Sequence, residues 1–413
     1  MDAGIEQRLA ELESAGLRRR TRLVSGPQGA RVVLDGKPVL LLCSNNYLGL
    51  ADHPRVREAA ADAAMRWGAG AGGSRLVSGT MTIHQRLEER LAGFKGTERA
   101  LLFGSGYLAN LGVLQALGVP GTLICSDELN HASIVDGCRL ARGRTAVYAH
   151  GDVEHLRWLL QTGPETRAVV VTDSVFSMDG DVAPLAELAT LTREHGGTLV
   201  VDEAHATGCV GPGGRGAVAE AGLDGEPDIV VVGTLGKALG AYGAFVASTG
   251  AVRELLVNTA RALIFSTAPP PPAVAAALAA LELLEEQPER VADLQARART
   301  LRTELAREGF DVAGSSTQIV PLVIGDAAQA MAVCEAALER GVFAQAIRPP
   351  TVPDGTSRLR LAVMASHTKA ELRDAARTLG RAALQAGFRP GDGMPVAAAV
   401  GMAEDSSRRV TVG

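Results

Sequence analysis

The sequence predicts an α/β fold, with a large domain built on a mainly parallel sheet and a smaller α+β domain near the C-terminus. From residue 100 onward, short β-branched or aliphatic runs alternate with segments of helical periodicity. This alternation is typical of parallel strands with helices on both faces of the sheet. Consecutive prolines at 269–272 and an alanine-rich helical segment then interrupt it. A chain of 413 residues has room for two or three domains.

The N-terminal segment 1–45 is expected to form a helix and an arm. Its first 20 residues are charged, follow a helical pattern and contain no apolar core of a signal peptide. The longest apolar stretch of the chain, 273–281, is too short to span a membrane, which takes about 20 residues.

The large domain is expected to cover residues 46–285 and to hold most of the strands. Ligands of such sheets bind beyond the carboxyl ends of the parallel strands. The runs predicted as strands are ALLF (100–103), TLIC (122–125), TAVY (145–148), AVVVTD (168–173), TLVVDE (198–203), DIVVVGT (228–234), GAFVAS (243–248) and ALIFST (262–267).

The pattern of the sequence changes near residue 285, where we expect a domain boundary. The small C-terminal domain, 286–387, contains a predicted helix at 294–308 and candidate strands at 319–324 and 357–363. The tail 388–413 is rich in glycine, alanine, serine and charge. We expect this tail to be flexible and assign it no function.

The net charge and the cysteine content of the chain indicate which binding partners are disfavoured. Forty-one basic and 46 acidic residues give a formal charge of −5, which provides no positive field for nucleic acid or an anionic membrane. The five cysteines are scattered and form no C-x-x-C pair, which argues against a disulfide framework and a structural zinc site. We therefore expect a cytoplasmic protein that handles small molecules, without metal, nucleic acid or membrane.

Three polar residues at the ends of two apolar runs suggest a cofactor site. Asp202 and His205 end one run, and Lys237 comes after the next. These residue types suit pyridoxal 5'-phosphate (PLP). The aspartate would pair with a protonated pyridine nitrogen, the histidine would hydrogen-bond the phenolic oxygen, and the lysine would hold the aldehyde as an imine. Together they would form an electron sink for carbanions.

Two nucleotide-binding interpretations fail on context. The run that ends in Asp-Glu-Ala-His resembles the acidic box of helicase-type ATPases, but the sequence contains no G-x-x-x-x-G-K-[ST] phosphate loop to accompany it. The segment GAGAGG (68–73) matches the dinucleotide fingerprint in letters only, because a helical segment precedes it where a strand is required. A loop near a ligand or a subunit contact is favoured for this segment.

A better phosphate site is predicted at FGSGYLANLGVLQAL (103–117). A strand ends at Phe103, glycines form the turn, and a helix opens near Tyr107, so free backbone amides and the helix dipole would face an anion. Gly106 and Tyr107 are the expected backbone donors. Thr234, in the loop before Lys237, could add its hydroxyl.

His131 comes after the strand 122–125, at the same edge of the predicted sheet. A lone histidine is usually a satisfied loop residue. Beside a pyridine ring, a stacking role is favoured.

With these residues in place, the chain resembles the α-oxoamine synthase family of fold-type I PLP enzymes over nearly its whole length. Several long motifs occur in the family's order. They are SNNYLGL (44–50), GAGGSRLVSGT (70–80), HQRLEERLA (84–92), DELNHAS (127–133), SVFSMDGDVAPL (174–185), VDEAHATG (201–208) and TLGKALG (234–240).

The resemblance implies roles for the PLP residues. Lys237 would carry the cofactor, Asp202 would pair with the ring nitrogen, and His131 would stack on the ring. The polar edge of the ring would be contacted by His205 and Ser177. The phosphate would be held by Gly106, Tyr107 and Thr234.

The resemblance also implies substrate contacts and a homodimer. Arg360 would bind the amino-acid carboxylate, a role that suits a planar two-pronged cation. The acyl side would be formed by Arg18, Arg348 and Thr351, and Asn45 would contribute a further substrate contact. Because the family's sites are shared between subunits, Ser266 or Thr267 of the neighbour would reach the phosphate.

Within the family, AIRPPTVPDGTSRLRLAVMASHT (346–368) looks like the member of biotin biosynthesis. That member condenses L-alanine with a pimeloyl thioester, carried on CoA or an acyl carrier protein, and releases carbon dioxide and a free thiol. The alternatives are siblings that use glycine or serine with another acyl thioester, namely 2-amino-3-ketobutyrate ligase, 5-aminolevulinate synthase and serine palmitoyltransferase. A non-catalytic PLP-fold binding protein is a further alternative, which the joint presence of Lys237, Asp202, His205 and His131 disfavours.

Overall fold

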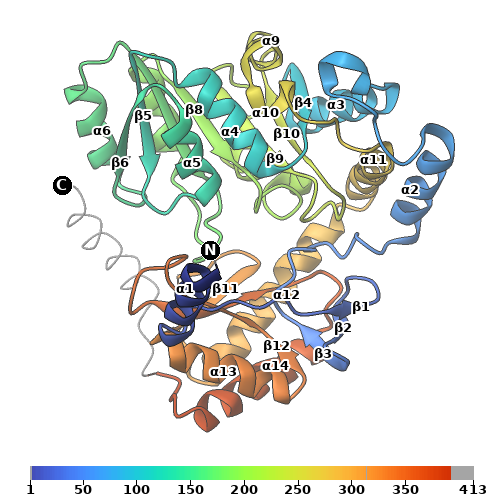
Figure 1. The fold of residues 1–413 in the computed structure, drawn as a ribbon, viewed down its shortest axis with the longest axis vertical. Coiled ribbons are helices and arrows are strands. Elements are labelled where there is room, and N and C mark those ends of the chain that lie inside the picture. Colours follow the sequence, from blue (N-terminus) through green and yellow to red (C-terminus); the bar gives the residue numbers. More distant parts are fainter. Residues whose placement is uncertain (1, 313, 392–413) are drawn as a thin grey trace. The chain divides into compact units, whose positions relative to one another are not determined.

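The computed structural model describes residues 2–312 and 314–391 (Figure 1). The chain forms two compact units. The larger unit consists of Asn45–Ser177 and Asp181–Leu294. The smaller unit consists of Met178–Gly180 with the described parts of Met1–Ser44 and Gln295–Gly413.

The larger unit is built on a seven-stranded sheet with the strand order β4-β10-β9-β8-β7-β5-β6. Strand β10 runs antiparallel to β4 and β9, and the other pairings are parallel. The sheet is therefore mainly parallel, as the sequence predicts. Its strands are β4 (Arg99–Phe103), β5 (Thr122–Asp127), β6 (Arg144–Tyr148), β7 (Arg167–Asp173), β8 (Thr198–Asp202), β9 (Ile229–Thr234) and β10 (Ala244–Ser248).

Helices cover this sheet, and α4 and α5 lie against its strands (Figure 1). The core between them contains fully buried side chains from both helices and from neighbouring strands, among them Val113, Ile134, Val200 and Val230. The helices of the larger unit are α2 (Pro54–Trp67), α3 (Thr82–Lys95), α4 (Gly106–Leu117), α5 (Ala132–Leu140), α6 (Val153–Thr162), α7 (Leu185–Glu194), α8 (Ala217–Glu220), α9 (Gly250–Thr259), α10 (Arg261–Ile264) and α11 (Pro271–Glu286), with a π-helix η1 (Arg75–Gly79) and a 3-10 turn η2 (Pro212–Gly214).

One predicted strand is wrong. The run ALIFST (262–267) forms helix α10 over Arg261–Ile264 and then a single bridge between Ser74 and Thr267. Periodicity alone cannot separate a short apolar run in a strand from one in a buried helix. Here packing decides the conformation, since Leu263 is buried in the same core cluster as Val113.

The segment GAGAGG lies between helix α2 and the π-helix η1. It neither comes after a strand nor opens an α-helix. Its position therefore agrees with the rejection of the dinucleotide fingerprint.

The smaller unit contains two small sheets and several helices. In one sheet the strand order is β1-β2-β3-β12, and in the other it is β11-β14-β13. The elements are α1 (Asp2–Ser14), β1 (Val24–Ser25), β2 (Arg31–Leu34), β3 (Lys37–Leu41), β11 (Ile319–Gly325), α13 (Ala327–Glu339), β12 (Val342–Phe343), β13 (Gln345–Ile347), β14 (Ser357–Ala362) and α14 (Lys369–Gln385), and α12 (Glu289–Arg307) runs from the larger unit into this one.

The N-terminal strands belong to the same unit as the C-terminal section. Strand β3 pairs in parallel with β12, with Leu40 opposite Val342. The boundaries predicted at 45, 285 and 387 stay predictions. Most of the predicted flexible tail, residues 392–413, lies outside the described residues.

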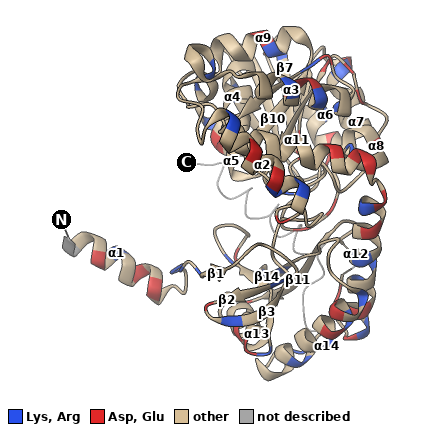
Figure 2. Cartoon of the chain, turned by 90° about the vertical axis from the view of Figure 1, so that its right-hand side faces the viewer, with Lys and Arg blue, Asp and Glu red and all other residues tan. Residues whose placement is uncertain are grey.

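Basic and acidic residues are interspersed on the helices (Figure 2). Among the described residues, no helix combines the length and the apolar character that a membrane crossing needs. The same residues contain no group of three or more His, Cys, Asp and Glu side chains that could hold a metal ion.

Candidate active site

A chain of hydrogen bonds connects Lys237 with three side chains of the larger unit. Lys237 Nζ lies 2.7 Å from His205 Nε2, and His205 Nδ1 lies 2.7 Å from the hydroxyl of Tyr47. The Tyr47 hydroxyl donates to Asn45 Oδ1 at 2.9 Å. Because that hydroxyl has one proton, His205 Nδ1–H donates to Tyr47 and Nε2 accepts from the lysine. This assignment leaves His205 as a neutral imidazole.

A second chain runs from Asp202 to His131. Asn110 Nδ2 donates to Asp202 Oδ2 at 2.6 Å and to Ser133 Oγ at 2.9 Å. Ser133 Oγ lies 2.7 Å from His131 Nδ1, which also accepts from the Ser133 backbone amide at 3.2 Å. The Asn110 amide is oriented by its partner, since its oxygen would repel the carboxylate. The other Asp202 oxygen accepts from Ala204 N at 2.8 Å.

Burial and nearby charges set the protonation of this group. Burial lowers the pKa of His131, the Asp202 carboxylate opposes that shift, and Lys237 reinforces it. Burial also raises the pKa of Asp173 well above its usual range, helped by the charge of Asp202 and opposed by a hydrogen bond from the His131 backbone amide. Burial of His131 therefore favours its neutral form, although the Asp202 carboxylate acts in the opposite direction.

The predicted phosphate turn opens helix α4. Ser105 caps the helix, and its hydroxyl accepts from Leu108 N at 3.2 Å. The first amides of a helix have no partner within the helix. A Cβ placed on Gly106 would meet no atom within 4 Å, so the space over this turn is open to a ligand. The phenol of Tyr107 donates to Asp136, which leaves the Tyr107 backbone amide as the group that could face a phosphate.

Thr234 lies at the end of strand β9, where the sequence predicts a further phosphate contact. Its Oγ1 accepts from Gly236 N at 3.2 Å and donates to the carbonyl of Gly243 at 3.2 Å. The hydroxyl therefore stabilises the loop that leads to Lys237.

Two other predicted cofactor contacts lie in separate segments. Thr267 is exposed and bridges to Ser74 beside the GAGAGG segment. Ser177 comes directly after the buried Phe176, in a turn closed by the bridge between Val175 and Val182.

The aminotransferase class I and II family model matches residues 37–379. The chain belongs to this family. It is 50% identical over 392 residues to 8-amino-7-oxononanoate synthase of Geobacter sulfurreducens, a match that covers 94% of this chain and 100% of that protein.

Solved structures of PLP enzymes are also similar to this chain. Serine palmitoyltransferase from S. paucimobilis with a bound PLP-myriocin aldimine has a TM-score of 0.88 and 33% identity, with 93% of this chain and 98% of that chain covered. The crystal structure of 8-amino-7-oxononanoate synthase from Francisella tularensis has a TM-score of 0.73 and 27% identity, with 85% of this chain and 99% of that chain covered. These findings confirm the predicted fold-type I architecture, the PLP cofactor and a PLP-dependent acyltransferase of the 8-amino-7-oxononanoate synthase type.

The residues present fit PLP. This aminotransferase-family enzyme has an amine on Lys237 to bond an aldehyde, an oriented carboxylate on Asp202 for a pyridinium, and an open helix N-terminus at Gly106 for a phosphate. Asn110 Oδ1 is buried with no hydrogen-bond partner among the described residues. A buried amide oxygen without a partner is costly, and such a group is typical of a site that is completed by a ligand.

The predicted substrate residues lie in the smaller unit, except Asn45. Arg360 is buried on the central strand β14, with Pro321 and Gln345 opposite it on the two flanking strands. Its backbone is therefore held within a regular sheet.

The predicted acyl-side residues are gathered around one region of the smaller unit. Arg18 pairs with Glu13. The same N-terminal turn is held by Arg348, which donates to the Gly16 carbonyl. Thr351 lies in the same turn as Arg348, because its backbone amide donates to the Arg348 carbonyl at 3.1 Å.

Tyr47, Asn110 and Ser133 are site residues that are not predicted from the sequence. Each is a polar residue that orients a predicted site residue. Asn110 carries a usable signal, since it is one of two amides in a mainly apolar helical segment. Tyr47 and Ser133 lie inside the motifs SNNYLGL and DELNHAS, but nothing in those letters names their partners.

Proposed function

We propose that this enzyme joins L-alanine to a pimeloyl thioester and releases 8-amino-7-oxononanoate, carbon dioxide and a free thiol. The observation that carries the proposal is the 50% identity to 8-amino-7-oxononanoate synthase of G. sulfurreducens over that protein's whole length. The two hydrogen-bond chains that end at Lys237 and Asp202 support it, because the reaction needs a base and a charge stabiliser at one carbon.

We assign proton transfer at Cα of L-alanine to Lys237. Its Nζ donates to a neutral ring nitrogen of His205 at 2.7 Å. A neutral acceptor can take a proton from the lysine and return it, which suits a group that acts first as a base and then as an acid. PLP, when bound, supplies an electron sink for the electron pair left at Cα.

Asp202 and His131 are assigned to different contacts with the cofactor ring. The Asp202 carboxylate would keep the ring nitrogen protonated, and Asn110 holds that carboxylate in one orientation. His131, kept neutral, would stack on the ring. The ring's oxygen would be contacted by His205 and Ser177.

The bond changes balance without a further reactant. The alanine Cα bonds to the thioester carbonyl carbon, and the thiolate leaves with the electron pair of the carbon–sulfur bond. The alanine carboxylate then lies β to the new ketone and leaves as carbon dioxide. A proton returned to the same carbon by Lys237 completes the product.

Substrate recognition is assigned to cations of the smaller unit. Arg360 would bind the alanine carboxylate through two parallel hydrogen bonds. Arg18, Arg348 and Thr351 would receive the far end of the acyl chain, where a terminal carboxylate suits their charge. Asn45 would contribute a further substrate contact.

We further propose a homodimer in which Thr267 or Ser266 of the neighbouring subunit completes the phosphate site. Three large apolar side chains near this segment are exposed in the single chain: Leu76, Val77 and Phe265, with 53%, 82% and 70% of their surface accessible. Apolar side chains gathered in this way are typical of a surface that another chain covers.

A cytoplasmic location completes the proposal. Five cysteines occur among the described residues, none of them in a disulfide, and four are buried. Free thiols persist in a reducing compartment. Fractionation of the native cells with an antibody against the chain would test this location.

An assay of purified holoenzyme with a substrate panel tests the function. L-Alanine, glycine and L-serine are each combined with pimeloyl, octanoyl and palmitoyl thioesters, and thiol release is measured together with the mass of the product. We expect L-alanine with the pimeloyl thioester to give the highest kcat/KM. The octanoyl analogue should be lower by about 10-fold to 100-fold, because cations of the site would lose their carboxylate partner. A preference for glycine or serine, or equal rates with both acyl chains, would contradict the proposal.

A further inference from the structure

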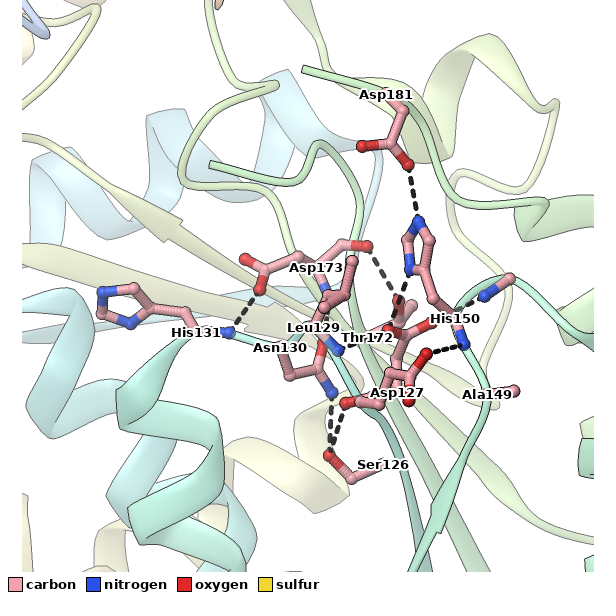
Figure 3. Close-up of polar contacts among 12 residues, drawn as sticks. Ser126, Asp127, Leu129, Asn130, His131, Ala149, His150, Thr172, Asp173 and Asp181 are labelled. Atoms are coloured by element: carbon pink, nitrogen blue, oxygen red, sulfur yellow. Dashed lines mark hydrogen bonds and ion pairs between the residues drawn. The ribbon is translucent and has the colours of Figure 1, made fainter. Parts of the chain in front are cut away.

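His150 lies in the loop between strand β6 and helix α6, and both of its ring nitrogens face carboxylates (Figure 3). Nδ1 is 3.0 Å from Asp127 Oδ1, and Nε2 is 2.8 Å from Asp181 Oδ2. An ionised carboxylate has no proton to donate, so both nitrogens must be donors. Burial opposes a charge on the ring, but the hydrogen bonds with the two carboxylates outweigh it and raise the pKa of His150 to about 10. The ring is therefore an imidazolium.

The first carboxylate belongs to the turn that carries His131. Asp127 ends strand β5, and its side chain accepts from Leu129 N at 2.9 Å and from Gly151 N at 3.0 Å as well as from His150. The start of the turn is thus fixed to the loop after β6.

The other end of this turn has a separate anchor. A side-chain oxygen of Asp173, at the end of strand β7, accepts from His131 N at 2.7 Å (Figure 3). His131 is therefore positioned from both sides, by Asp127 through His150 and by Asp173 directly.

The second carboxylate belongs to the turn that carries Ser177. Asp181 lies on the return side of this turn, and its carbonyl accepts from Phe176 N at 3.1 Å. The His150 ring also packs edge-on against the Phe176 ring, with centroids 4.3 Å apart. Phe176 is buried and precedes Ser177 directly.

We propose that His150 is a positioning residue for the reaction, a cation clamped between Asp127 and Asp181 that fixes both the turn carrying His131 and the turn carrying Ser177. The proposal rests on the proposed contacts of His131 and Ser177 with the cofactor. One charge thereby sets the separation of two turns that come from different strands of the sheet. A neutral side chain with donors on one atom cannot bond both carboxylates in this way.

Protonation is tested in holoenzyme labelled with ¹⁵N-histidine. We expect one histidine with both ring nitrogens protonated at about pH 8, and its signals should disappear in His150→Gln. A neutral His150 under these conditions would overturn the proposal.

Positioning is tested by PLP affinity and by kinetics. In His150→Gln we expect PLP to bind at least about tenfold more weakly and kcat to fall by about 100-fold, as for a misplaced active-site group. The KM values for both substrates should change much less, because the displaced residues face the cofactor. The control is His195→Gln, a histidine of the same unit whose ring bonds the Leu191 carbonyl at 3.0 Å, and it should match the parent. Parent-like PLP affinity and kcat in His150→Gln would overturn the positioning role.

A second substitution separates a charge clamp from simple packing. Without the imidazolium, Asp127 and Asp181 repel each other, so His150→Gln combined with Asp181→Asn should bind PLP more tightly than His150→Gln alone. Additive losses would overturn the proposal. If His150→Gln does not fold, Asp181→Asn alone is decisive: it keeps the histidine and should lower its protonation midpoint and weaken PLP binding, whereas parent values for both would overturn the clamp.

The proposed role of His150 and the proposed function are tested by different measurements, so one can be contradicted without the other. PLP affinity and histidine protonation are measured without either substrate, so a wrong amino acid or acyl chain leaves them unchanged. Conversely, the substrate panel could confirm L-alanine and the pimeloyl thioester while His150→Gln binds PLP like the parent, which would remove the positioning role alone.

Discussion

Asp202 and Glu203 are neighbours in the chain, yet their carboxylates have different kinds of partner. Glu203 is fully buried, and its Oε2 accepts from Lys95 Nζ. The same ammonium group also donates to Thr207 Oγ1 at 2.8 Å and to the Arg215 carbonyl at 2.6 Å. All three ammonium hydrogens therefore have an acceptor. We call Lys95 and Glu203 a closed pair, because each charge has the opposite charge as its partner.

The Asp202 side of strand β8 is built from neutral partners. Its carboxylate is held by the Asn110 amide and the Ala204 backbone, and the lysine of this side, Lys237, meets a neutral histidine. A charge held by neutral groups keeps most of its field for a ligand, whereas a charge closed by an opposite charge does not. The difference teaches that the kind of partner, more than burial, separates the carboxylate that we propose to act in the reaction from the structural one.

Lys237→Ala should have the largest effect. We expect kcat to fall by at least about 10⁴-fold, since we propose that this one group supplies both the bond to the cofactor and the proton transfer. The free energy of unfolding should stay close to that of the parent. Steady-state kinetics and urea denaturation measure the two quantities, and borohydride reduction with peptide mass analysis should locate the cofactor on Lys237 in the parent. Attachment to another lysine would contradict the assignment.

Asp202→Asn should keep the fold and lower kcat by about 10³-fold, because a neutral amide cannot hold a proton on the ring nitrogen. Rapid mixing of holoenzyme with L-alanine and an acyl thioester measures the chemical step. The matched control is Asp136→Asn, an acid that bonds Tyr107 and Arg139 near the surface. Parent-like rates in Asp202→Asn would place the reactive carboxylate elsewhere.

Breaking the closed pair should affect stability instead of chemistry. Lys95→Met leaves the Glu203 carboxylate buried without its cation, which costs about 3–5 kcal/mol of unfolding free energy. The double variant Lys95→Met with Glu203→Gln should recover part of that loss. Urea denaturation measures both, and kcat per folded molecule should change little. A variant that loses turnover without losing stability would break the comparison between the two carboxylates.

The position of candidate site residues at strand ends is what the sequence predicts well, whereas their roles stay predictions. Asp202 and Thr234 are predictable because parallel strands are continuous apolar runs that bring polar residues to one edge. The partners Tyr47 and Asn110 are not predictable in this way, since each reaches its imidazole or carboxylate from a distant segment through tertiary packing. The run 262–267 is predicted wrongly for the same reason, because the neighbours of Leu263 decide its conformation.

Lys95 shows a similar limit. Its position in an amphipathic helix gives no hint of full burial, because the acceptors that permit it come from Glu203, Thr207 and Arg215. The pairing of β3 with β12 is also invisible in sequence order. The local sequence pattern thus predicts helices, strands and their ends. The partners of charged side chains depend on tertiary packing, which the local pattern does not show.

The smallest expected effect is on the titration of His131, and it distinguishes the two carboxylates directly. Burial holds the pKa of His131 below its ordinary value of 6.5, and the Asp202 carboxylate partly raises it. Asp202→Asn removes that raising influence, so the pKa of His131 should fall further, while Glu203→Gln should leave it unchanged. NMR titration of ¹⁵N-histidine in the cofactor-free protein measures the shift.

The same shift predicts how stability depends on pH, with a definite sign. A histidine whose pKa is depressed in the folded state takes up its proton first in the unfolded state, so stability is lost as pH falls below 6.5. Asp202→Asn should therefore lose more stability than the parent in acid, and Glu203→Gln should lose no more through His131 than the parent does. Urea denaturation across this pH range measures the difference. An unchanged pKa of His131 in both variants would contradict this prediction. It would show that Asp202, like Glu203, has no electrostatic influence on the pKa of His131.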